Sequence, residues 1–176
     1  MIKLLGTIAI GACLVVAAFA GACAGNPKSG YTVASAYRSD IRTVSVPIFD
    51  NTTYEHNLEA QLTDAIVKEI HRTTPWRVVP PGSGQTTLSG VIVAADLRKL
   101  TTQGTSGLVE TLAVDMSVNF DWKENKTGQV LVARRNFRSS RAFAPALGAK
   151  ESLESGQSST IDQLAKDIVA ELRSSW

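Results

Sequence analysis

The sequence predicts an α+β domain, a two-layer sandwich with two helices on one face of a four-stranded mixed sheet. Four segments have the pattern of strands, two have apolar residues at helical spacing, and the order of elements is β-α-β-β-β-α. Since each element has one apolar face, placing both helices on the same side of the sheet buries all of these faces. A chain of 176 residues suits one such domain.

The first strand is predicted over residues 42–49. Its apolar side chains Val44, Val46 and Ile48 alternate with polar or exposed positions, as in a strand with one buried face. Pro47 has no amide hydrogen to donate to a neighbouring strand. We therefore expect an edge strand or a bulge here.

The first helix follows this strand. Thr52 and Glu55 have the spacing of a capping box, which marks a helix start. The apolar stripe of this helix comprises Leu58, Leu62, Ala65, Ile66 and Ile70. Pro75 ends the helix because its ring cannot continue the helical hydrogen bonding.

Three further strands form the second half of the predicted sheet. They cover Thr87 to Leu97, the region around Thr111 to Trp122, and Gln129 to about Arg141. The middle strand alternates most clearly, with Leu112, Val114, Met116, Val118, Phe120 and Trp122 on one face. A turn at residues 126–128 joins it to the last strand, whose odd positions include Leu131, Ala133 and Phe137 and whose even positions carry Arg134, Asn136 and Arg138.

The final segment, Glu151 to Trp176, is predicted to be an amphipathic helix. Its apolar residues at spacings of three and four are Ile161, Leu164, Ala165, Ile168, Val169 and Leu172. This stripe needs a sheet to cover it, which favours the two-layer arrangement.

Composition argues against several classes of function. A formal charge of +2 is too small for a nucleic-acid-binding protein recognised by its electrostatics. Cys13 and Cys23 both lie near the N-terminus, and His56 and His71 are the only histidines, so the domain has no thiolate or multi-histidine metal motif. No catalytic motif occurs at recognisable spacing. We expect no enzyme activity, no cofactor, no metal and no nucleic-acid partner.

The N-terminus predicts export and lipid attachment. Residues 4–22 carry no charge and lead into Ala20-Gly21-Ala22-Cys23, which resembles the lipobox of bacterial lipoproteins. Residues 1–22 are then a signal peptide, and Cys23 carries the lipid that holds the protein at a membrane. A retained transmembrane anchor, or cleavage without lipid, are the alternatives, and the run ending at Cys13 is a second, shorter candidate.

A flexible tether is predicted between the lipid and the domain. Residues 23–30 consist of the lipidated cysteine and a stretch of small and turn-forming residues, and the folded domain covers residues 31–176. Ala24 stands where many inner-membrane lipoproteins have Asp. In a double-membraned bacterium this pattern favours the periplasmic side of the outer membrane.

Several motifs together resemble the LptE family of lipopolysaccharide-assembly lipoproteins. They are Val44 to Glu55 (VSVPIFDNTTYE), Leu58-Glu59, Leu62-Thr63, Arg77 to Val79, Leu88 to Gly90, the strand from Glu110, and Thr127 to Leu131. They occur in the order of that family and span roughly residues 30–176. The resemblance implies an LptE-like periplasmic domain that plugs and stabilises the outer-membrane β-barrel LptD and assists insertion of lipopolysaccharide into the outer leaflet.

Other families share parts of this pattern. Lipoprotein activators of peptidoglycan synthases open with a similar strand and helix, and this is the main alternative. Secretion channels of the curli type also do, but they need membrane-crossing segments for which the chain leaves little room. A periplasmic hydrolase would need a polar catalytic constellation that the sequence does not show.

Four basic residues are the candidate contacts to lipopolysaccharide, whose phosphates match the forked guanidinium of arginine. In a meander of the last three strands, Arg98 and Lys99 are expected near Arg138 and Arg141, forming a basic tip. The competing interpretation is surface pairing. A turn near residues 125–126 would set Ser117 opposite Arg134, with Asp115 diagonal to it; Arg134 and Arg135 are therefore weaker candidates.

Replacing Cys23 by Ser removes the predicted acyl acceptor and should abolish fatty-acid labelling of the protein in cells. The Cys13→Ser variant should still be labelled, because the apolar run before Cys13 is shorter and Cys23 remains in this variant. Labelling of the Cys23→Ser variant would show that the lipid is attached at another residue.

Overall fold

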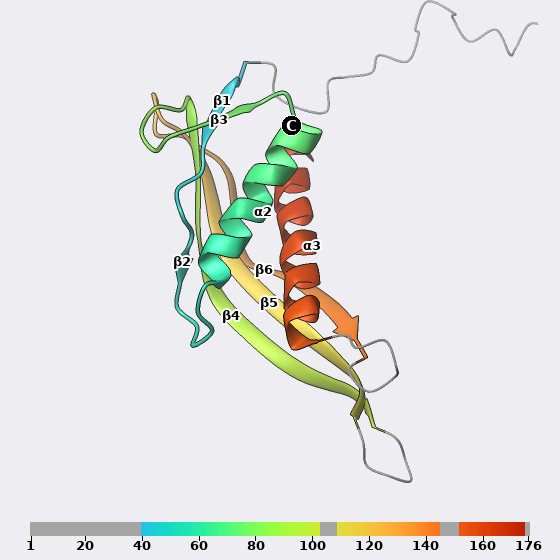
Figure 1. Ribbon diagram of the computed structural model, residues 1–176. Helices are drawn as coiled ribbons and strands as arrows, with labels where there is room; N and C mark the ends of the chain where they lie inside the picture. Colours follow the sequence, from blue (N-terminus) through green and yellow to red (C-terminus); the bar gives the residue numbers. More distant parts are fainter. Residues whose placement is uncertain (1–39, 103–108, 145–151, 175–176) are drawn as a thin grey trace, which may run out of the picture. The chain divides into compact units, whose positions relative to one another are not determined.

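The computed structural model describes residues 40–102, 109–144 and 152–174 (Figure 1). These residues form, in order, β1 (Thr43–Ser45), β2 (Asp50–Asn51), α2 (Leu58–Thr73), β3 (Arg77–Val79), β4 (Thr86–Thr102), β5 (Val109–Glu124), β6 (Val130–Phe143) and α3 (Leu153–Ser174). Within the described part of the chain, neither helix has a long enough apolar stretch to cross a bilayer. The predicted signal peptide, Cys23 and the tether lie outside the described residues.

The strands form one mixed sheet in the order β3-β1-β4-β5-β6, with β2 also paired to β4. The pairs that involve β1, β2 and β3 are parallel, whereas β4, β5 and β6 form an antiparallel meander. Both helices lie on the same face of this sheet (Figure 1). The predicted two-layer α+β class is confirmed, but the described sheet has six strands rather than four. The two extra strands, β2 and β3, are only two and three residues long, too short to show a periodic pattern.

The chain leaves the sheet between β1 and β2, which corrects the predicted first strand. Pro47 and Ile48 lie in this gap, and the Ile48 side chain is 69% exposed instead of sharing the buried face of Val44. Phe49 is the buried residue, at 1% exposure. Of the two expectations for Pro47, an edge strand or a bulge, the edge position is wrong, because β1 lies between β3 and β4; the strand is instead interrupted at residues 46–49. Pro47 is tolerated because no strand needs its missing amide hydrogen there.

Phe49 packs against β4 at a glycine. A Cβ atom on Gly90 would lie 2.4 Å from Phe49 Cε1 and 2.6 Å from the carbonyl oxygen of Asn119. The backbone amide of Phe49 donates to Thr63 Oγ1 of α2 at 3.0 Å in a buried hydrogen bond. One aromatic residue therefore links the β1–β2 connection to the sheet and to the first helix.

The predicted capping box at the start of α2 does not form. The N-cap is Asn57, whose φ of 68° is left-handed and whose side chain makes no capping hydrogen bond. Thr52 Oγ1 donates to the carbonyl oxygen of Ile92 at 2.9 Å, so it is used to fasten the loop to β4. Asn51 Nδ2 donates to Glu59 in the first turn at 2.9 Å. The segment before α2 is thus held by its hydrogen bonds to β4 and by Asn51. The Glu55 side chain makes no capping hydrogen bond.

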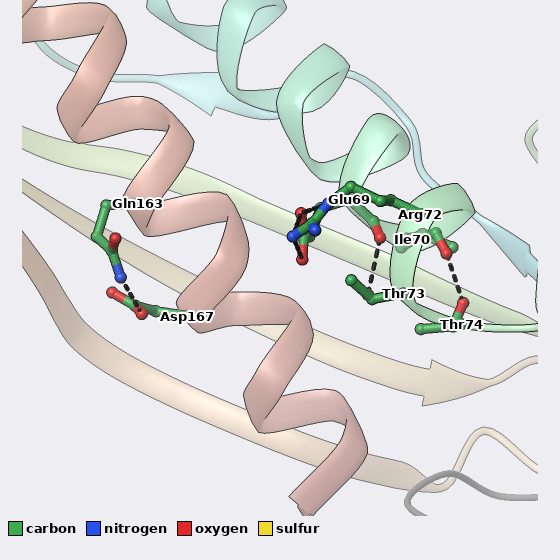
Figure 2. A network of polar contacts seen from close by, with 7 residues as sticks. All are labelled: Glu69, Ile70, Arg72, Thr73, Thr74, Gln163 and Asp167. Carbon is green, nitrogen blue, oxygen red and sulfur yellow. Dashed lines mark hydrogen bonds and ion pairs between the residues drawn. The ribbon is translucent and has the colours of Figure 1, made fainter.

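Threonine hydroxyl groups close the C-terminal end of α2, as Figure 2 shows. Thr73 Oγ1 donates to the carbonyl oxygen of Glu69 at 2.8 Å, and Thr74 Oγ1 donates to that of Ile70 at 2.7 Å. These bonds satisfy carbonyl groups that lack a partner at a helix end. The helix ends just before Pro75, as the sequence predicts.

The core lies between the two helices and the adjacent face of the sheet. From the helices it takes Leu58, Leu62, Ile66, Ile70, Ile161, Leu164, Ala165, Ile168, Val169 and Leu172. From the long strands it takes Leu88, Ile92, Met116, Val118, Phe120, Trp122 and Val132. The predicted stripes of both helices and of the middle strand are therefore confirmed, except that Ala65 and Leu112 are only half-buried.

A bulge in β6 changes which of its residues face the helices. Val118 pairs with Phe137 and Phe120 with Arg134, so Arg135 and Asn136 together oppose the single residue Asn119. Asn136 has a left-handed φ of 51°, and its amide donates to Asn119 Oδ1 at 2.8 Å. After the bulge, odd-numbered residues such as Phe137 face the helices, as predicted. Before it, the extra residue reverses the alternation, so that even-numbered residues such as Arg134 face the helices.

Replacing Gly90 by Ala should destabilise the domain by about 1–3 kcal/mol, because the added methyl group overlaps Phe49 and the β5 backbone. Urea denaturation followed by circular dichroism measures the change. Ser89→Ala is the matched control, since Ser89 precedes Gly90 on the same strand and its side chain points to the opposite face. Equal stability of the two variants would contradict the close approach.

Candidate functional site

The helix-free face of β4, β5 and β6 carries a polar groove. Its volume is about 550 Å³, and we call it the sheet groove. Its polar lining consists of Asp96, Arg98, Asp115, Ser117, Asn136, Arg138, Ser139 and Ser140. The groove exists because alternation along the strands sends apolar residues toward the helices and these polar residues to the other side.

Asp115 lies at the centre of the hydrogen bonding in the sheet groove. Arg98 Nε donates to its carboxylate at 2.8 Å, and the Ser140 hydroxyl group donates to the same carboxylate. These bonds, with the more distant charge of Arg138, hold the pKa of Asp115 below its ordinary value of 3.8. Asp96 stands directly opposite Asp115 on β4, yet its side chain makes no hydrogen bond or ion pair with any described residue.

Arg138 and Ser117 are neighbours across the β5–β6 pair, and both have unused hydrogen-bonding groups. The exposed Arg138 side chain has no ion pair or hydrogen bond among the described residues. Ser117 is 5% exposed, and its Oγ atom is buried without a hydrogen-bond partner. A buried hydroxyl group in this condition costs free energy.

A second hollow of about 530 Å³ lies on the same strands, near the bulge. Arg135 lines it and pairs with Asp121 at 2.9 Å, while also donating to the carbonyl oxygen of Phe120 at 3.2 Å. Arg135 and Asp121 thus satisfy one another, and Asp50 adds a second carboxylate to the lining. Unlike the sheet groove, it offers no uncommitted guanidinium group.

The structure divides the four basic residues that the sequence grouped into one tip. Arg98 and Arg138 share the helix-free face and line the sheet groove. Arg141 pairs with Val114 on the other face, where it donates to Gln163 of α3; Figure 2 shows Gln163 donating in turn to Asp167. Lys99 pairs with Leu112, which belongs to the same face as Val114.

The predicted pairing of Asp115 with Arg134 is wrong. Ser117 lies opposite Arg138 instead of Arg134. Next to the turn, Lys123 already pairs with Val130, two residues further along than the predicted turn gives, and an irregularity near the turn and the β6 bulge add one residue each. Arg134 reaches α3, where its Nε donates to Glu171 at 2.9 Å. Asp115 takes Arg98 as its partner, from the strand on its other side.

Sequence reasoning missed Asp96, Ser117 and Asn136 as parts of a site. The alternation of β5 could have placed Ser117 beside Asp115 on the polar face, but the position of Asn136 depends on the bulge. His56 and His71 are both exposed. Among the described residues, no group of acidic, histidine or cysteine side chains could hold a metal ion.

Comparison with known proteins gives one family and several similar folds. The family model LptE, described as lipopolysaccharide-assembly, matches residues 41–173. A hypothetical protein of Chlamydia trachomatis has a similar structure, with a TM-score of 0.54 at 10% identity over 76% of this chain and 96% of that one. A protein of Xanthomonas campestris gives 0.52 at 11% identity over 76% and 87%. No curated protein matches the sequence significantly.

Replacing Arg98 by Gln should raise the pKa of Asp115 toward its ordinary value of 3.8, because the largest cause of its depression is removed. A carboxylate with a lowered pKa adds stability above its unfolded pKa and loses it as the pH falls through the folded value. The stability difference between wild type and variant should therefore shrink in strong acid. Carboxyl-detected NMR titration measures the pKa, and an unchanged value would contradict the contact.

Proposed function

Because the chain belongs to the LptE family of lipopolysaccharide-assembly proteins, we propose that it is an outer-membrane lipoprotein that plugs and stabilises the β-barrel LptD. In this function it assists the insertion of lipopolysaccharide into the outer leaflet. The observation that carries the proposal is the family match, which extends over residues 41–173 and so includes every described helix and strand except the last residue of α3. The match does not favour the activator of a peptidoglycan synthase, and it supports a role outside catalysis.

The surface of the domain is compatible with a place inside a barrel. The lumen of large outer-membrane barrels is polar, so a plug must present polar side chains outward. Here the core side chains of β4, β5 and β6 are buried under α2 and α3, although Leu97, Leu100 and Val130 on these strands are 43–50% exposed. The helix-free face carries charged and hydroxyl groups. A domain built in this way can fill a wet lumen without exposing its core.

The N-terminal segment supplies the proposed attachment. Lipid on Cys23 would anchor the protein on the periplasmic side of the outer membrane, and residues 24–30 would span the distance to the domain. Ala24 rather than Asp after the cysteine supports the outer membrane. We also keep Arg98, Lys99, Arg138 and Arg141 as proposed contacts to lipopolysaccharide phosphates, now on two faces.

Affinity purification of the tagged full-length protein from detergent-solubilised envelopes should recover a large outer-membrane β-barrel of the lipopolysaccharide-export type. We expect near-equal amounts after a salt wash, because a plug and its barrel form a stoichiometric complex. Mass spectrometry identifies the partner. Recovery of a peptidoglycan synthase in place of a barrel would move the protein to the activator function and refute this proposal.

A further inference from the structure

The second hollow on the helix-free face has an uncommitted acidic group beside an exposed apolar side chain, and we call it the Ile48 hollow. The chain between β1 and β2 provides one wall through Pro47, Ile48 and Asp50, and β4, β5 and β6 provide the rest of the lining. Its volume is about 530 Å³, and it shares no lining residue with the sheet groove. It is therefore a separate feature of this face, with its own chemistry.

The register of the sheet creates this hollow and fixes its wall. The pairing of β1 with β4 reaches Thr87, and the pairing of β2 with β4 starts at Val91. Residues 46–49 lie between these points, opposite only residues 88–90 of β4, so this longer segment leaves the sheet between two fixed ends. The buried side chain of Phe49 also holds it. A wall that is already ordered loses little conformational freedom when it binds a group.

The Asp50 carboxylate is the group in the Ile48 hollow that lacks a partner. Its side chain is exposed and makes no hydrogen bond or ion pair with any described residue. Arg135, the basic residue of the lining, pairs with Asp121 at 2.9 Å and donates to the carbonyl oxygen of Phe120 at 3.2 Å. Since Arg135 is committed to these groups, the negative charge of Asp50 remains uncompensated.

Ile48 supplies the apolar side of the hollow. Its side chain is 69% exposed, although isoleucine is one of the residue types most often buried. A single exposed apolar residue is common on protein surfaces. Ile48, however, lines the same hollow as Pro47, Val91 and the unpaired carboxylate of Asp50. A group with an apolar stem and a cationic end would cover Ile48 and neutralise Asp50 at the same time.

We propose that the Ile48 hollow binds an arginine or lysine side chain of a protein partner, with its methylene stem on Ile48 and its cationic end on Asp50. This inference rests on the proposed function, because the polar lumen of the barrel is the surface that would present this side chain. Charge selects the class of group, since an anion would be repelled by Asp50 and a neutral apolar group would leave the carboxylate without a donor. The described residues bring no set of ligands for a metal ion together here.

The test is an NMR titration of the full-length protein in oligo(ethylene glycol) ether micelles, observed at the backbone amides of residues 48–50. The probes are N-acetylargininamide, the neutral N-acetylcitrullinamide of nearly the same shape, and ethanolamine, the cation of a lipid headgroup. We expect the arginine probe to bind most tightly, with an affinity that falls as salt is added. Equal binding of the citrulline probe would refute the charge contact, and equal binding of ethanolamine would refute the contact of the stem.

Matched variants locate the bound probe. Asp50→Asn should weaken the binding of N-acetylargininamide about fivefold, which is the size expected for an exposed ion pair. Ile48→Ser should weaken it severalfold without lowering thermal stability, because most of the Ile48 side chain is already exposed. Asp64→Asn, which changes an exposed carboxylate of α2, should bind like wild type. Wild-type affinity in both hollow variants, or an equal loss in Asp64→Asn, would overturn the inference.

A salt series on the purified complex with the barrel tests the hollow in its proposed setting. Asp50→Arg should release the barrel at a lower salt concentration than Asp64→Arg, because it places a like charge beside the incoming basic side chain. Release of both variants at the same salt concentration would overturn the inference and leave the barrel complex intact. If wild type recovers no barrel, the proposed function fails, and the titration alone decides whether the hollow binds a basic side chain.

Discussion

The alternation of apolar and polar side chains along three long antiparallel strands is the constraint on which this structure depends. Each of these strands has one face that must be covered, and α2 and α3 cover it together. Two helices cannot also cover the other face, so the polar residues of β4, β5 and β6 remain open there. The core and the candidate site are thus two results of the same two-residue period.

Irregular positions in the strands determine which side chains become neighbours. Phe49 can pack this closely on β4 only because Gly90 has no side chain. The β1–β2 connection, which includes Pro47, leaves the sheet just before Phe49. The bulge at Arg135 and Asn136 shifts β6 by one residue, which places Arg138 rather than Phe137 beside Ser117. Without the shift, the free guanidinium group and the unpartnered hydroxyl group would not meet.

The family assignment and the groove concern different levels of function. Membership of the LptE family connects the chain with lipopolysaccharide assembly, and the proposed lipid anchor, barrel and outer-membrane location extend that connection. The groove concerns chemistry within the domain. Asp115 holds Arg98 and Ser140 on the helix-free face, and Arg138 remains uncommitted because that carboxylate already has its partners.

Local sequence patterns were enough to predict the α+β class, the stripes of both helices, the face of β5 and the end of α2 at Pro75, because each is a local periodic or steric effect. Tertiary structure decided the remaining features. The short β2 and β3 are set by pairing with distant strands, and Thr52 bonds to Ile92 instead of capping α2. The separation of Arg98 and Arg138 from Lys99 and Arg141 depends on register, which local patterns cannot fix when a bulge adds a residue.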